Sequence, residues 1–104
     1  MVVEKRDPKK NVIGVAWYRR DQWPRLLEIS TDRSELEDSY DNWLVHVREA
    51  FQRMSNEGID PVKVDIDTEE LLDWCRSRNL AVNARARAQY VTEKVQKSQQ
   101  SPPH

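Results

Sequence analysis

The stretch N-V-I-G-V-A-W-Y-R-R-D-Q-W-P-R-L-L-E-I, residues 11–29, decides the fold. Its first part is apolar and rich in β-branched and aromatic residues, so we predict a strand from Val12 to Tyr18. Two arginines follow, and then comes Asp21, a good N-cap, with Pro24 placed for the first turn of a short helix. A strand, a charged corner and a helix are therefore expected in direct succession.

The predicted strand is apolar on both faces, because successive side chains of a strand point to opposite sides. Ile13 and Trp17 lie on one face, together with Val15. Gly14 and Ala16 lie on the other face, and both are small. Small residues in a strand suit the close approach of a helix or of a neighbouring backbone, so we expect tight packing on this second face.

Hydrophobic periodicity predicts a long second helix. A capping box at Asp32 or Ser34 begins the helix, and Gly58 is suited to the left-handed conformation that ends it. Its apolar residues recur at three- and four-residue steps over about five turns, as expected for a helix that buries one face. This stripe consists of Leu36, Tyr40, Trp43, Leu44, Val47, Phe51 and Met54.

The second half of the chain repeats the order of elements. A strand is predicted from Pro61 to Asp67, with Val62, Val64 and Ile66 inward. Asp67 caps a third helix, and Asn83 caps a fourth helix that ends near Val95. The core positions of these two helices are predicted to be Leu71, Leu72, Cys75, Ala84, Ala88, Val91 and Val95.

The expected fold class is therefore α/β of the α+β type, in the order βααβαα, with a two-stranded sheet packed by four helices. The pattern leaves the relative direction of the two strands open. Residues 1–10 are predicted to be a mobile arm, residues 11–95 a single α/β domain, and residues 96–104 a disordered tail.

Composition favours a small cytoplasmic protein. The chain has 104 residues, 34% of them charged, and a formal net charge of −1. No apolar run approaches the roughly 20 residues of a membrane helix, and the first ten residues lack the apolar core of a signal peptide. The single cysteine, Cys75, excludes an internal disulfide. We expect no membrane partner.

No set of residues points to catalysis. Asp65, Asp67 and Thr68 are similar in order to the nucleophile motif of haloacid-dehalogenase-like phosphatases, but those enzymes need a long parallel sheet and further residues downstream. Helix capping explains Asp67, and His46 and Cys75 lack a catalytic partner. We therefore predict a non-enzymatic protein with no catalytic residue, no cofactor and no metal site.

The charged corner is a candidate recognition surface for an acidic peptide or a phosphate. Arginines beside aromatic rings either stack inside the fold or form a binding hot spot, and the internal interpretation is favoured because small domains need bulky aromatics for their core. The residues of this surface are Tyr18, Arg19, Arg20, Trp23 and Arg25.

Residues 68–91 offer an alternative function, because they resemble a helix-turn-helix. The net charge is +3 over residues 1–31, −9 over 32–73 and +5 over 74–104. The favoured interpretation is that the basic ends fold against the acidic middle, and the alternative is that the last third meets an anionic partner. Arg85, Arg87 and Gln89 would contact nucleic acid. Arg87, however, occupies a position where such motifs usually bury an aliphatic residue.

The run from Ile13 to Asp21, with Trp23 and Trp43 behind it and the segment from Asp67 to Cys75, resembles a family of small bacterial proteins of unknown function. The resemblance covers about residues 12–95 and implies a bacterial origin, with no catalytic residues to transfer. The most favoured function is an interaction or regulatory module that binds a protein partner or a second copy of itself, and the alternative is nucleic-acid binding.

Overall fold

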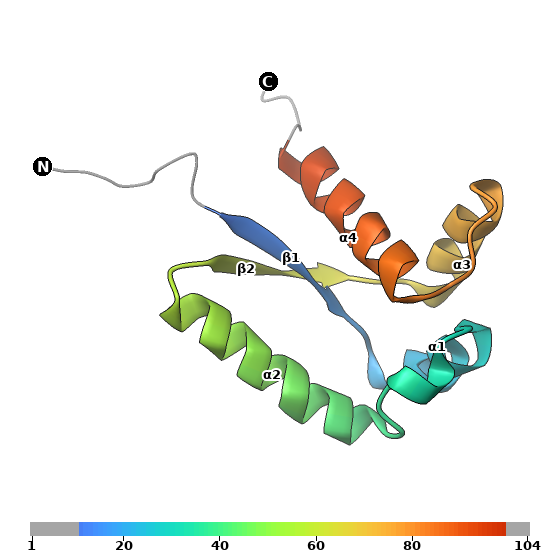
Figure 1. Cartoon of the computed structure of the whole chain (residues 1–104), viewed down its shortest axis with the longest axis horizontal. Coiled ribbons are helices and arrows are strands. Elements are labelled where there is room, and N and C mark those ends of the chain that lie inside the picture. Colours follow the sequence, from blue (N-terminus) through green and yellow to red (C-terminus); the bar gives the residue numbers. More distant parts are fainter. Residues whose placement is uncertain (1–10, 100–104) are drawn as a thin grey trace, which may run out of the picture.

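The structure is a computed structural model that describes residues 11–99. The element order is βααβαα, which confirms the predicted fold class and order (Figure 1). Two 3₁₀ turns, η1 (Arg20–Gln22) and η2 (Arg33–Glu35), precede α1 and α2 respectively. The main elements are β1 (Val12–Trp17), α1 (Trp23–Ile29), α2 (Tyr40–Asn56), β2 (Asp60–Asp65), α3 (Thr68–Ser77) and α4 (Ala84–Gln99).

The two strands run parallel, which settles the direction that the sequence left open. Their register begins with Val12 opposite Asp60 and ends with Trp17 opposite Asp65. The short α1 turns the chain and the long α2 returns it, so that β2 starts at the same end as β1 (Figure 1). The helices α2 and α4 lie on opposite sides of the strand pair (Figure 1).

The helix α4 packs directly on Gly14, as the small residues of β1 predicted. A methyl group added at Gly14 would lie 2.6 Å from Val95 Cγ2 and 2.7 Å from Val91 Cγ1. Such distances are far below van der Waals contact, so a side chain at this point of the strand would force Val91, Val95 or α4 to shift. The absence of a side chain at Gly14 therefore sets how closely α4 approaches the sheet.

The hydrophobic core lies between α1, α3, α4 and one side of the sheet. Val64 and Ile66 are buried as predicted, whereas Val62 is 38% exposed. No residue of β1 is fully buried, and none of α2 is either. The core consists of Tyr18, Trp23, Leu26, Val64, Ile66, Leu71, Cys75, Val82, Ala86, Tyr90 and Val91.

Two helix starts were predicted wrongly. Asp21 is not the N-cap of α1, because it lies inside η1, which runs straight into the helix and supplies the Arg20 carbonyl to the Trp23 amide. The helix α2 begins at Tyr40 and not near Asp32 or Ser34. Its N-cap is Ser39, whose hydroxyl accepts a hydrogen bond from the Asn42 amide at 3.1 Å.

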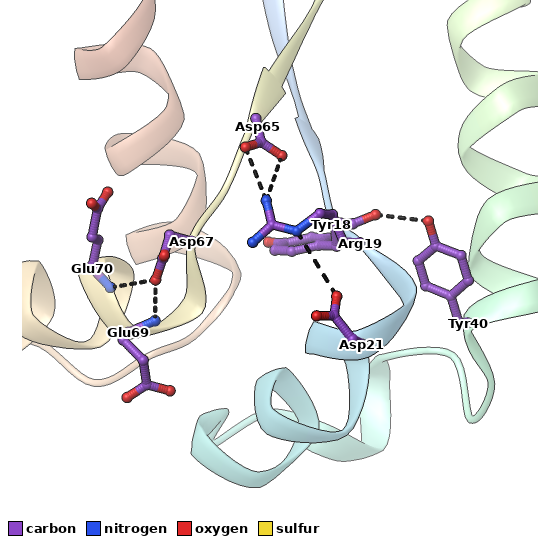
Figure 2. A network of polar contacts seen from close by, with 8 residues as sticks. All are labelled: Tyr18, Arg19, Asp21, Tyr40, Asp65, Asp67, Glu69 and Glu70. Carbon is purple, nitrogen blue, oxygen red and sulfur yellow. Dashed lines mark hydrogen bonds and ion pairs between the residues drawn. The ribbon is translucent and has the colours of Figure 1, made fainter.

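Other boundaries were closer. Asp67 caps α3 as predicted, because its carboxylate accepts hydrogen bonds from the Glu69 and Glu70 amides at 2.9 and 3.1 Å (Figure 2). The helix α4 continues to Gln99, so residues 96–99, which were predicted to belong to a disordered tail, are helical. The predicted arm at residues 1–10 and the last five residues lie outside the described part of the chain.

Candidate functional site

The two aromatic members of the predicted recognition surface are buried. Tyr18 is 5% exposed and Trp23 is 3% exposed, and their rings meet edge to face at 5.9 Å. Tyr40 donates a hydrogen bond from its hydroxyl to the Tyr18 carbonyl at 2.8 Å (Figure 2). Burial raises the pKa of Tyr18 to about 12, so the phenol stays neutral. These rings belong to the core and leave the corner without aromatic anchors.

Arg19 ties the corner to the second strand. Its guanidinium donates to both carboxylate oxygens of Asp65, at 3.1 and 3.3 Å, and lies 3.9 Å from the Asp21 carboxylate (Figure 2). Asp65 is the last residue of β2 and lies opposite Trp17, so this ion pair joins the ends of the two strands. The contact accounts for both Arg19 and Asp65 without a ligand.

The other two arginines of the corner are also paired within the chain. Arg20 donates to Asp41 at 2.8 Å and lies over the Tyr40 ring. Arg25 donates to Glu69 at 2.7 Å, and this hydrogen bond lowers the pKa of the Glu69 carboxyl. Exposed ion pairs of this kind add little stability, but they neutralise the cations that would attract an acidic ligand.

Arg87, one of the three candidate nucleic-acid contacts, is buried. Its guanidinium makes a two-pronged contact with Asp32 at 2.7 and 2.9 Å and donates to the Ser30 hydroxyl at 3.2 Å. The hydrogen bond from Arg87 outweighs burial and lowers the pKa of the Asp32 carboxyl. Arg87 therefore links α4 to the segment after α1, and it is not available to contact nucleic acid.

Arg85 and Gln89 do lie exposed on α4. Two residues along a helix correspond to a turn of about 200° around its axis, so Arg85 and Arg87 occupy nearly opposite sides of α4. Only Arg85 and Gln89 of the predicted set share a face that is open to solvent.

Residues considered for catalysis do not converge. His46 Nδ1 lies 2.7 Å from Glu37 Oε2 on the surface, far from Cys75 in the core. Burial raises the pKa of the Cys75 thiol and keeps it protonated. Within residues 11–99, no group of three or more His, Cys, Asp and Glu side chains is arranged to hold a metal ion.

A groove of about 760 Å³ follows β1 between α2 and α4, and sequence reasoning did not predict it. Its floor is β1 from Val12 to Ala16. Figure 1 shows the two helices that form its walls, with β1 between them. The wall residues include Trp43, Val47 and Met54 of α2 and Ala84, Ala88 and Thr92 of α4.

The floor of this groove is the free edge of β1. In a parallel ladder, the amide and carbonyl of one residue face one neighbouring strand, and those of the next residue face the opposite way. Asp60 donates to the Asn11 carbonyl and Ile66 donates to the Trp17 carbonyl, so odd-numbered residues of β1 pair with β2. The amides and carbonyls of Val12, Gly14 and Ala16 therefore face the groove, where the described chain supplies no strand.

The sequence of β1 lacks the charges and prolines that usually protect an edge strand. Proteins usually place charges, prolines or bulges on an open edge, because an unprotected edge pairs with other chains. The strand β2 follows this rule, since its sequence D-P-V-K-V-D contains Pro61 and three charged residues. The strand β1, V-I-G-V-A-W, has neither proline nor charge. This contrast was visible in the sequence and was the signal that could have located the groove.

The walls of the groove, formed by α2 and α4, are apolar but partly exposed to solvent. The predicted stripe of α2 faces the sheet, yet all of its residues remain partly exposed to solvent. On α4, Ala84 and Ala88 were predicted to be core residues, but both are exposed at the groove. The buried side of α4 is instead centred on Ala86, Arg87, Tyr90 and Val91, because Arg87 is held by Asp32.

Comparisons of the chain with protein-family models, with curated proteins and with solved structures gave no match. Among the described helices, none is both long and apolar enough to cross a membrane.

Proposed function

We propose that the protein is a non-enzymatic interaction module that binds an extended segment along the free edge of β1, in the groove between α2 and α4. The observation that carries the proposal is the unprotected edge of β1 beside the protected edge of β2. Addition of a strand to an open sheet edge is a common way of recognising an extended chain, with backbone hydrogen bonds giving affinity and side-chain pockets giving specificity.

Two further features support this binding mode. The groove presents three residues whose backbone groups pair with no strand within residues 11–99, Val12, Gly14 and Ala16, at the two-residue spacing that an added strand requires. Both walls are largely apolar, so an added strand would bury side chains on both of its faces. The ligand expected from this geometry is a segment of about six residues that is apolar at successive positions and free of proline.

Peptide selection tests this proposal. A random peptide library should enrich extended, proline-free apolar segments on the immobilised protein. Ala88 is exposed on the groove wall, so Ala88→Lys should weaken binding of the selected peptides at least about tenfold, by placing an unpaired charge against the apolar ligand. Gln89→Lys is the matched control, because Gln89 is equally exposed on α4 but does not line the groove. Selection of no binder by protein shown to be monomeric, or equal binding by both variants, would contradict the proposal.

Nucleic-acid binding is the second candidate. It is supported by the exposed Arg85 and Gln89 and by the basic last third of the chain. The burial of Arg87 weakens it. Retention on heparin that falls steeply with salt and is lost in Arg85→Gln would favour this alternative.

A further inference from the structure

We propose, building on the strand-binding function above, that the segment bound in the groove is β1 of a second copy of this chain. Two chains would then form a symmetric dimer whose sheet has the order β2-β1-β1-β2. A two-stranded sheet is marginal by itself, and joining two of them gives the four strands typical of independently stable sheets. The same surface patch would serve both chains, as in most dimers with two-fold symmetry.

The edge of β1 is complementary to itself. In an antiparallel pair centred on Gly14, Val12 lies opposite Ala16 of the second copy, and Gly14 lies opposite its own counterpart. These are the residues whose amides and carbonyls face the groove, so each pairing can form two backbone hydrogen bonds. Even-numbered residues of one β1 lie opposite even-numbered residues of the other in this register. Their side chains therefore lie on the same face of the joined sheet, and the α4 face of one sheet continues as the α4 face of the other.

The groove side of α4 carries the small side chains that a second α4 over the adjoining strand would require. Paired strands lie about 4.8 Å apart, whereas packed helices need about 8 Å or more, so helices above adjoining strands must have small facing side chains. Ala84, Ala88 and Thr92 follow each other at four-residue steps on the exposed groove side of α4. These three small residues form one stripe, where larger side chains would separate the two helices.

Sedimentation equilibrium of the full chain tests the proposal. The monomer mass is 12.3 kDa, and we expect twice this mass at about 100 μM. Ala88→Lys should raise the dissociation constant by more than about 100-fold, because it places a lysine of each chain on the groove side of α4 that faces the second copy. Gln89→Lys, with the same change in charge, should leave the constant within about threefold of the unmodified chain.

A second variant acts on the strand itself. Val12→Pro removes an amide hydrogen that faces the groove and is not used by β2, so the fold should persist while the dimer weakens. Circular dichroism of each variant checks that the helices are retained. A monomeric wild type, or a dimer that neither variant weakens, overturns the inference. If the wild type is monomeric but selected peptides still bind the groove, the strand-binding function stands without self-association; if no peptide binds either, both proposals fail.

Discussion

At the residue scale, the contact between Arg87 and Asp32 is the most buried ion pair among the described residues. The side chains of Arg87 and Asp32 are only 11% and 15% exposed, so each desolvated charge depends on the other. We predict that Arg87→Ala lowers the free energy of unfolding by about 3–5 kcal/mol, because Asp32 is left as an unpaired, largely buried charge. Urea unfolding measures this change. A loss of less than about 1 kcal/mol in the free energy of unfolding would show that the Asp32 carboxylate becomes hydrated in the variant.

The same ion pair predicts a pH dependence. The folded-state pKa of Asp32 is lowered, so its stabilising contribution is present in full above the unfolded pKa of about 3.9 and is lost as the pH falls through the folded value. Asp32→Asn should remove this contribution at neutral pH and flatten the dependence of unfolding free energy on pH below about 4. Urea titrations of both proteins at a series of acidic pH values measure this. Parallel profiles for the two proteins would contradict it.

Gly14 gives a third prediction at this scale. Gly14→Ala places a methyl group within 2.7 Å of Val91 and Val95, so we expect a loss of about 1–3 kcal/mol in the free energy of unfolding. The measurement is again urea unfolding. Unchanged stability would mean that α4 moves away from β1 at no cost, and the groove wall would then be less fixed than the structure indicates.

The sequence could not place residues whose partners lie far along the chain. Arg87 meets Asp32 across a separation of 55 residues, and no periodicity reports such a contact. Asp32 has the residue type and spacing of a helix cap, but its carboxylate binds Arg87 and the Ala84 amide instead. The prediction that α2 begins near Asp32 was wrong, because the Asp32 carboxylate bonds to distant groups and does not cap this helix.

At the element scale, the position at which α2 begins depends on the residue that caps it, which is Ser39 in the structure and was predicted to be Asp32 or Ser34. Ser39→Ala removes the hydroxyl that accepts from the Asn42 amide and should cost about 1 kcal/mol of stability. Ser34→Ala is the matched control, since Ser34 is exposed in η2 and its effect should stay within about 0.5 kcal/mol. Urea unfolding of the two variants measures the loss of stability caused by each substitution. A larger loss for Ser34→Ala would restore the boundary expected from the sequence.

Elements with local signals were predicted well. The strand β1 follows from an apolar run, β2 follows from the alternation of apolar and charged residues, and the start of α3 follows from Asp67. The parallel arrangement could not be predicted, because it depends on how α1 and α2 share the return path. The open groove could not be predicted either, because an amphipathic pattern shows which face of α2 is apolar but not how fully that face is covered.

At the scale of the whole molecule, the two halves of the domain differ in how completely they are packed. The side that contains α1, α3 and the buried face of α4 holds the core, whereas α2 and β1 contain no fully buried residue. An unprotected strand edge lies at the floor of this less covered side. Strand addition accounts for both features at once, because an added strand would pair the edge and cover the two walls.

Amide hydrogen exchange along β1, measured by NMR on the full chain, tests this account most directly. The Ile13 and Val15 amides face β2 and should be protected at every protein concentration, which makes them the internal reference. The Gly14 and Ala16 amides face the groove. We predict that they exchange rapidly in dilute protein and become protected as concentration rises, or when a selected peptide is added. Rapid exchange of Gly14 and Ala16 under all of these conditions would contradict strand binding at this edge.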